Sequence, residues 1–294
     1  MEFTDVGPFI YHRLLQLYDL KAGTIRFGSV GGGCINETYK ITFNEHQLFC
    51  KVNSATKFPH LFDKESHGLT LIARQNVIRV PEVIDSFEAA GKQVLLLEWI
   101  NEGERSNGFW KRFGEQLAAL HQCTNDYFGL EKDNYMGSVE QRNVPTDKWT
   151  DFFVQQRLEP LLKQCAAQGL LSSAHLSGLE QLYYKLPSIF AGKQKPSLVH
   201  GDLWSGNFMC DENSEPVLID TAAYYGHPSV DLGMSTLFGG FRKGFYEAYN
   251  YNSPFPSNNK EQWEVCNLYP LLIHLILFGR SYLSQIEAIL QRYC

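Results

Sequence analysis

The stretch LVHGDLWSGNFMC, residues 198–210, carries an aspartate, Asp202, and an asparagine, Asn207, five positions apart. A carboxylate can accept the proton of a substrate hydroxyl, and an amide oxygen can bind Mg²⁺. Their D-x-x-x-x-N spacing is that of a kinase catalytic loop, in which the aspartate is the base and the asparagine holds the metal. A second carboxylate, Asp220, ends the β-like run PVLID and could also bind metal. Polar turns after apolar strands explain any one of these residues, but not their order and spacing together.

Upstream, glycines gather in GSVGGGCINETYKI, where Gly31, Gly32 and Gly33 fall in a turn between two expected strands. Without a Cβ atom, such a turn lets backbone N–H groups approach phosphate oxygens. An ordinary flexible hairpin is an equally open interpretation of the turn alone. The turn is not a G-x-x-x-x-G-K-[ST] loop, which argues against a P-loop NTPase. Cys34 lies in the same turn, where its thiol could be either oxidisable or inert.

Two charged residues follow the glycine turn at informative positions. Lys51 lies in the next expected strand, and Glu65 lies 14 positions later in an expected helix. In protein kinases, a strand lysine reaches the nucleotide phosphates and is held by a glutamate of the following helix. Either residue alone is more often solvated surface. Their place relative to the glycine turn favours the phosphate-binding interpretation.

The elements that must position these residues change in type along the chain. Apolar spacing predicts a helix over 9–20 and another over 62–75. Alternating or β-rich runs predict strands over 24–30, 35–43, 47–53 and 93–100. From about residue 108 the sequence is mainly helical, with only SLVH and PVLID as β-like interruptions, and the polar, Gly-rich segment 101–108 is the expected connector.

Composition limits the possible partners. The 294 residues are 44% hydrophobic and 20% charged, which is enough to bury a sizeable core. A net charge of −6 gives no field that would attract nucleic acid or an anionic membrane, so we expect neither as a partner. We therefore expect a small, soluble partner.

The termini and cysteines indicate the compartment. The N-terminal stretch has no basic segment followed by an apolar run and a cleavage site, so it does not indicate a secretory signal. The most apolar stretch, LYPLLIHLILFG at 268–279, is shorter than the roughly 20 residues that span a bilayer. The seven cysteines are spread widely with no C-x-x-C pair. We therefore expect a cytoplasmic protein without a zinc ribbon or a disulfide framework.

Beyond these residues, the sequence resembles the fructosamine kinases, or ketosamine-3-kinases, which share the protein-kinase-like and aminoglycoside-phosphotransferase-like fold. The resemblance covers nearly the whole chain, through GGGCINETYKI, LLLEWI, GEQLAALHQ, DNYMGSVEQRN, LVHGDLWSGN, AAYYGHPSVDLGM and LFGGFRKGFYEAYN. The segments HGDLWSGN and YYG…VDL separate it from choline and aminoglycoside kinases, which share the aspartate and the asparagine but not the aromatic surroundings.

The resemblance implies a role for each matching residue. Asp202 would be the catalytic base, Asn207 and Asp220 would hold Mg²⁺, and Lys51 paired with Glu65 would orient the ATP phosphates. The backbone of residues 98–100, which are Glu98, Trp99 and Ile100, would bind adenine.

Two departures from the family pattern are Thr221, where proline is usual, and Gly233, where alanine is usual. We expect them to alter local rigidity without loss of activity.

Four neighbouring residues allow both a structural and a chemical interpretation. We expect His200 to brace the loop and Asp231 to be a structural acceptor that ties a helix start to the loop. Trp204 and Tyr224 could stack on a sugar or fill the cleft wall.

Together these observations predict an α+β, two-lobed protein-kinase-like fold. Residues 1–100 would form a small β-rich lobe that clamps ATP, and residues 101–294 a mainly helical catalytic and substrate lobe. The implied reaction is ATP-dependent phosphorylation of O3 of a ketoamine, either free or protein-bound, which leads to deglycation. A kinase for another small alcohol or amine and a nucleotide-binding pseudokinase scaffold remain alternatives, although Asp202, Asn207, Asp220 and Lys51 are all intact. The sequence does not determine the oligomeric state.

Overall fold

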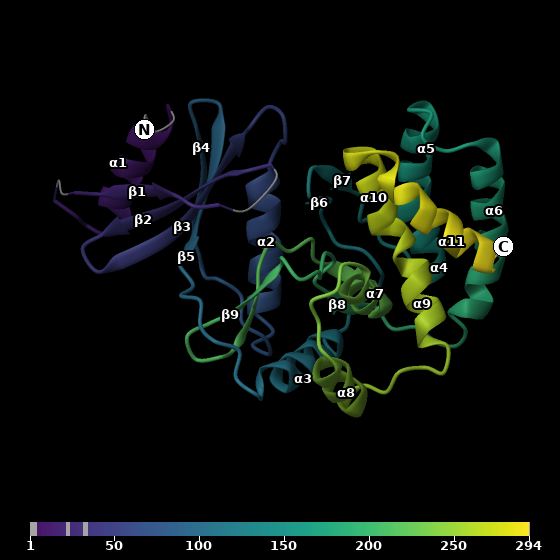
Figure 1. The fold of residues 1–294 in the computed structure, drawn as a ribbon. Coiled ribbons are helices and arrows are strands. Elements are labelled where there is room, and N and C mark those ends of the chain that lie inside the picture. The colour runs from purple at the N-terminus through teal and green to yellow at the C-terminus, as the bar shows by residue number, and fades with distance from the viewer. Residues whose placement is uncertain (1–4, 22–23, 32–34, 294) are drawn as a thin grey trace.

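The chain folds into a β-rich part and a mainly helical part, which lie side by side in Figure 1. The computed structural model describes residues 5–21, 24–31 and 35–293. The β-rich part contains α1 (Gly7–Leu17), β1 (Arg26–Ser29), β2 (Glu37–Phe43), β3 (His46–Ser54), α2 (Leu61–Ala73), β4 (Val83–Ala89) and β5 (Lys92–Glu98). Its five strands form one sheet in the order β1-β2-β3-β5-β4, and every neighbouring pair is antiparallel.

The helices α1 and α2 cover opposite faces of this sheet. Successive side chains of a strand point to opposite faces. In β5, Val94 and Leu96 pack in one apolar cluster with the buried residues of α1, whereas Leu95 and Leu97 pack in another with those of α2. Because both faces are covered, β5 is an unbroken apolar run and not an alternating one.

One strand of this sheet was not predicted. Strand β4 lies at the edge, and its residues are only partly buried or exposed. Such a strand carries no clear apolar alternation, and periodicity is the signal on which the sequence prediction relied. The remaining predicted strands and both predicted helices of this part are present, with ends shifted by a few residues.

The mainly helical part contains six short strands among its helices. The elements are α3 (Phe109–His121), β6 (Asn134–Met136), β7 (Val139–Gln141), α4 (Trp149–Phe152), the π-helix η1 (Phe153–Leu158), α5 (Glu159–Ala167), α6 (Ser173–Ile189), β8 (Ser197–Val199), β9 (Phe208–Cys210), β10 (Pro216–Leu218), β11 (Tyr224–Gly226), α7 (Ser229–Leu237), α8 (Lys243–Asn252), α9 (Asn259–Cys266), α10 (Leu268–Phe278), the 3₁₀-helix η2 (Arg280–Tyr282) and α11 (Leu283–Tyr293).

The short strands pair as β6–β7, β9–β10 and β8–β11, all antiparallel. The sequence prediction had only two of them, β8 and β10, because a run of three residues is too short to show a period. These pairs position the loops of the site. The loop between β8 and β9 holds Asp202 and Asn207, and Asp220 follows β10.

The segment between β5 and α3 lies directly against the β9–β10 hairpin. The backbone N–H of Gly103 donates to the carbonyl of Cys210 at 2.9 Å. A Cβ atom on Gly103 would lie 2.3 Å from the carbonyl oxygen of Asp211, so only glycine fits this approach.

The apolar cluster that includes Leu95 and Leu97 of β5 extends into the mainly helical part. It also contains Leu69 of α2, Phe113 of α3 and Phe208 of β9, so the core continues from one part into the other. Within the described residues, no helix has both the length and the apolar character needed to cross a bilayer.

Candidate active site

Six of the predicted site residues, among them Trp204, line one cleft, which has a volume of about 370 Å³. Lys51 comes from β3, Glu65 from α2, Asp202 and Asn207 from the loop after β8, and Asp220 from the end of the β10 segment. The tertiary structure thus brings together residues up to 169 positions apart in the sequence.

Lys51 is the centre of the ionic contacts in this cleft. Its Nζ donates to Glu65 Oε1 at 2.6 Å and also to Asp220 Oδ1, and its side chain is almost fully buried. Burial by itself would lower the pKa of Lys51, but the two carboxylates more than offset it and raise that pKa. Burial also raises the pKa of Glu65, which the charge of Lys51 opposes. A fixed, charged lysine at this place can hold negatively charged phosphate oxygens.

Asp202 and Asn207 are in direct contact. The amide Nδ2 of Asn207 donates to the carboxylate Oδ2 of Asp202 at 2.9 Å and to its backbone carbonyl at 2.8 Å. Burial raises the pKa of Asp202 to about 7, against the hydrogen bond from Asn207. A carboxylate with a pKa near neutrality is suited to accept a proton from a hydroxyl group.

His200 and Asp231 hold the backbone of this loop, as the sequence predicted. The buried carboxylate of Asp231 accepts the backbone N–H groups of His200 at 2.7 Å and of Gly201 at 2.9 Å. His200 donates from Nε2 to the carbonyl of Ile219 and accepts the Asp202 N–H at Nδ1. Burial lowers the pKa of His200, and the neutral ring matches this donor and acceptor pair. His200 therefore connects the Asp202 loop to the segment between β10 and Asp220.

The two departures from the family pattern have structural counterparts. The hydroxyl of Thr221 donates to the carbonyl of His200 at 3.0 Å, a bond that proline cannot make, so it adds a tie between the same two loops. Gly233 lies where α7 meets α9, and a Cβ atom there would lie 2.6 Å from the carbonyl oxygen of Trp263. This close contact between α7 and α9 thus requires glycine, and Gly233 does not make the helix pair less rigid.

The donor set fits a magnesium ion that arrives with phosphate. Both Nδ2 bonds of Asn207 go to Asp202, which leaves its amide oxygen for another partner. Asp220 offers a second carboxylate oxygen, and its side chain is 44% exposed. Magnesium prefers such oxygen ligands and takes the rest from phosphate and water. Across the described residues, no three His, Cys, Asp or Glu side chains form a metal cluster, so the protein alone does not offer a full cage.

The residues predicted to hold the rest of the nucleotide lie elsewhere or outside the described residues. Gly32, Gly33 and Cys34 fall outside the described residues, and Gly31 has no atom within 4 Å of where its Cβ would be. The next two residues, Ile35 and Asn36, line the cleft.

The segment predicted to bind adenine is Glu98, Trp99 and Ile100, at the end of β5 and directly after it. The carboxylate of Glu98 pairs with Arg79, and its N–H donates to the carbonyl of Glu82. The ring of Trp99 lies under the Nζ atom of Lys40, 4.1 Å from the ring centroid. Both side chains are thus engaged on the protein itself, which leaves only the backbone of the segment for the predicted adenine contact.

The two aromatic candidates for substrate contact differ in position. Trp204 lines the cleft and is 37% exposed, and its ring lies so close to Gly206 that a Cβ there would meet it at 2.3 Å. Tyr224 is fully buried, with its ring 4.0 Å from the guanidinium carbon of Arg157. The expectation that Tyr224 contacts a sugar is therefore corrected, because a side chain enclosed by the core does not reach the cleft.

Sequence reasoning missed one wall of the cleft. Asn134, Tyr135, Gly137 and Ser138 of the β6–β7 hairpin line it. The buried Asn134 donates to the carbonyl of Ala223, just after the Asp220 loop, at 2.9 Å. The signal was present in the segment DNYMGSVEQRN, which carried the family resemblance without being given a role.

Two apolar residues of the cleft lining were also missed. Leu277 and Phe278, at the end of α10, line it. Their apolar stretch was weighed only as a membrane segment.

The chain matches the family model for fructosamine kinase over residues 12–294. It belongs to the fructosamine kinase family. A Synechocystis protein described as a probable ketoamine kinase is 38% identical over 90% of this chain and 88% of its own length. A chloroplastic protein-ribulosamine 3-kinase of Arabidopsis thaliana is 35% identical over 91% of this chain and 82% of its own length. Membership in a kinase family implies that ATP is the phosphoryl donor.

Solved structures agree with the family and identify the fold. A structure described as a candidate fructosamine-3-kinase from Haemophilus somnus superposes with a TM-score of 0.87 at 27% identity, over 97% of this chain and 96% of that one. The aminoglycoside phosphotransferase APH(4)-Ia superposes with a TM-score of 0.65 at 12% identity, over 97% of this chain and 98% of that one, which shows a shared fold alone. The predicted two-lobed, protein-kinase-like fold is confirmed.

Proposed function

We propose that this protein transfers the γ-phosphoryl group of ATP to O3 of a ketoamine, a fructosamine or a ribulosamine, carried on a protein or on a free amine. The observation that supports this most directly is the meeting of Lys51, Asp202, Asn207 and Asp220 in one cleft. The relatives are named as ketoamine and ribulosamine kinases. A pseudokinase that had lost phosphoryl transfer would be expected to lack one of these four side chains.

Each side chain has one task in the proposed reaction. Asp202 accepts the proton of the acceptor hydroxyl as that oxygen attacks the phosphoryl group. Lys51, held by Glu65, neutralises phosphate oxygens. Asn207 and Asp220 would hold Mg²⁺, which supplies further positive charge to the transferring group when it is bound. Most of the catalysis is therefore positioning and charge stabilisation.

The lobes have separate tasks in this proposal. Residues 1–100 would clamp the nucleotide, with the backbone of 98–100 and the glycine turn of Gly31, Gly32 and Gly33 around it. Residues 101–294 would supply the catalytic loop and the acceptor site, in which Trp204 would face the sugar. This division is supported by the origin of Lys51 in β3 and of Asp202 in the loop between β8 and β9.

The cysteines favour a reducing compartment, and we place the protein in the cytoplasm on that ground. Cys50, Cys123, Cys165, Cys210 and Cys266 are all free thiols in the structure. Free, mostly buried thiols are typical of proteins that never meet an oxidising environment.

Phosphorylation at O3 would make the adduct unstable. The carbonyl of a ketoamine is at C2, so enolisation toward C1 places the C3 oxygen where it can leave by β-elimination. Phosphate leaves far more readily than hydroxide, and hydrolysis of the remaining imine by water then frees the amine and a deoxy-dicarbonyl. The proposed enzyme would thus begin a repair of glycated amines.

The deciding experiment is ³¹P NMR of the products after incubation with Mg-ATP and a glycated lysine. We expect a phosphomonoester on C3, followed by slow release of amine and inorganic phosphate after the enzyme is removed. A product phosphorylated at C6, or one that keeps its sugar, would refute the repair proposal and leave a sugar kinase. Phosphorylation of an aminoglycoside but of no ketoamine would refute the substrate class.

A further inference from the structure

The lining of the active-site cleft includes both charged and apolar side chains. Lys51, Glu65 and Asp220 line it with charged groups, whereas Leu277 and Phe278, at the end of α10, form what we call its apolar end. These two side chains are 39% and 53% exposed. Adjacent exposed apolar residues at the mouth of a polar cleft are unusual enough to ask what covers them.

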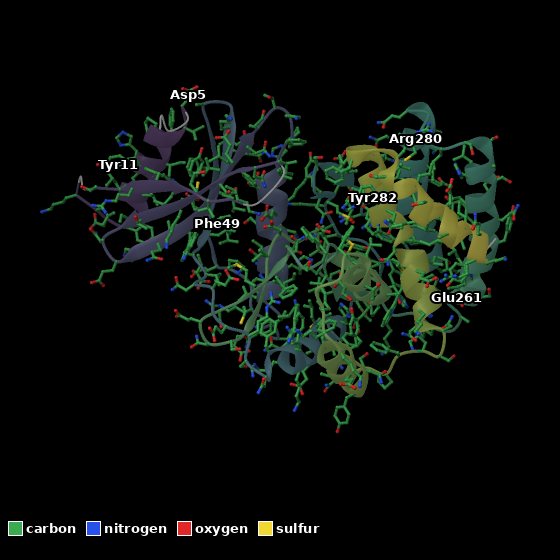
Figure 2. All side chains as sticks on the ribbon, in the orientation of Figure 1. Asp5, Tyr11, Phe49, Glu261, Arg280 and Tyr282 are labelled. Atoms are coloured by element: carbon green, nitrogen blue, oxygen red, sulfur yellow. The ribbon has the colours of Figure 1, made fainter. Side chains whose placement is uncertain are left out.

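A row of rings connects this apolar end to the catalytic loop. Ring centroids are 6.1 Å apart between Trp204 and Phe238, 4.9 Å between Phe238 and His274, and 5.3 Å between His274 and Phe278. Tyr282 adds to the row, 4.9 Å from His274. Figure 2 labels Tyr282 beside Arg280, where α10 gives way to α11. The row holds Phe278 in place although half of its surface is open.

The proposed reaction decides which part of a substrate meets this apolar end. The phosphates must lie near Lys51 and the acceptor hydroxyl near Asp202. The polar sugar then meets the polar and aromatic part of the lining, which includes Asn134 and Trp204. What remains of a ketoamine is the carbon chain on its amine nitrogen, which is bonded to C1, two carbons from C3, and this chain is left for the apolar end.

On the basis of the function proposed above, we propose that Leu277 and Phe278 bind the unbranched carbon chain that the acceptor amine carries, such as the side chain of a glycated lysine. Apolar walls recognise a chain of CH₂ groups by excluding water from it, and each buried CH₂ favours binding. Leu277 and Phe278 carry no charge, so their contribution to recognition depends on chain length and not on charge. The enzyme should therefore prefer ketoamines of longer alkylamines.

The test uses ketoamines of methylamine, butylamine and hexylamine, made from ribose or glucose. For the wild-type enzyme, we expect kcat/KM to rise about tenfold from methylamine to hexylamine, which corresponds to two or fewer fully buried CH₂ groups. The double variant Leu277→Ala/Phe278→Ala should lose most of this rise. Its kcat/KM should fall least for the methylamine adduct, whose amine carries the shortest chain, and most for the hexylamine adduct.

Phe9 offers a matched control. It is a phenylalanine on a helix of the other part of the molecule, 50% exposed, and it does not line the cleft. Phe9→Ala should keep the wild-type dependence on chain length, which excludes a general effect of removing an exposed ring.

Three outcomes would overturn the proposal, and they separate it from the proposed function. Equal kcat/KM for all chain lengths in the wild type, with phosphorylation intact, would overturn this proposal alone. So would an equal loss on all three substrates in the double variant, or self-association of the wild type in sedimentation that the double variant lacks, because the two side chains would then form a self-association surface. If the wild type phosphorylates no ketoamine, the proposed function fails as well.

Discussion

A single methyl group added at Gly233 should destabilise the fold, although alanine is the usual residue of the family at this position. Gly233 lies inside α7, where a Cβ atom would meet the carbonyl oxygen of Trp263 at 2.6 Å and Asn267 Oδ1 at 2.9 Å. Real Cβ contacts essentially never fall below 3.0 Å. The nearer obstacle is the backbone of α9, so α7 and α9 would have to move apart.

Gly178, inside α6, provides the matched control for this change. A Cβ atom there would lie 3.6 Å from Leu290 Cδ1, which is ordinary van der Waals contact. Replacing glycine by alanine within a helix stabilises it by about 1 kcal/mol. Forcing an extra methyl into a packed contact costs about 1–3 kcal/mol. We therefore expect Gly178→Ala to gain up to about 1 kcal/mol and Gly233→Ala to lose about 1 kcal/mol.

The measurement is urea unfolding of both variants beside the wild type, with thermal unfolding as a second readout. Because the helix propensity gain is common to both, the difference between the variants reports the clash itself. A loss of 1 kcal/mol should lower Tm by about 2 °C in a chain of this size. If Gly233→Ala proved as stabilising as Gly178→Ala, the close approach of α7 and α9 would be wrong.

Four further variants probe the active site and buried polar groups of the mainly helical part. Asp202→Asn should lower kcat by about 10²–10⁴-fold and leave ATP binding unchanged, because it removes only the proton acceptor. Asp220→Asn should lower kcat and also weaken the binding of Mg-ATP. An equal loss of ATP binding in both variants would contradict this division of roles. Asp231→Asn should lower the free energy of unfolding in urea by about 3 kcal/mol, because the buried carboxylate accepts two backbone N–H groups of the loop. If Asp231→Asn were as stable as Asp202→Asn, Asp231 would not stabilise the fold. Burial lowers the pKa of His227 to about 3, so the unfolded chain binds a proton that the fold excludes as pH falls below about 6.5. The free energy of unfolding of the wild type should therefore fall by about 2 kcal/mol between pH 7 and pH 5, and this contribution should be absent in His227→Gln. An identical pH dependence of stability in the two proteins would refute this assignment.

Local sequence patterns were sufficient for the chemistry that depends on spacing. Asp202 and Asn207 lie in one loop, and a five-residue separation fixes their contact once that loop is braced. The strand of Lys51 and the helix of Glu65 follow from periods of 2 and 3.6 residues. The structural roles of His200 and Asp231 were also predicted, because a second base was not needed beside Asp202.

The parts that were missed depend on contacts between distant segments. Tyr224 has the composition of a sugar-stacking residue, and only the packing of Arg157 against its ring shows that it is core. The β6–β7 hairpin joins the cleft through the bond between Asn134 and Ala223, 89 positions apart. A strand of three residues is too short to show a period of 2, so the sequence pattern could not predict β6 or β7.

The sequence by itself determined which groups can react. The chemical type of each side chain and its spacing from nearby residues can be read from the sequence alone. The tertiary structure alone decided where the cleft ends and what lines it. Leu277 and Phe278 continue the same apolar run as the buried residues of α10, and their exposure at the cleft mouth comes from how that helix packs. Burial is a property of the assembled neighbours, so a pattern of apolar residues cannot tell a core face from a binding surface.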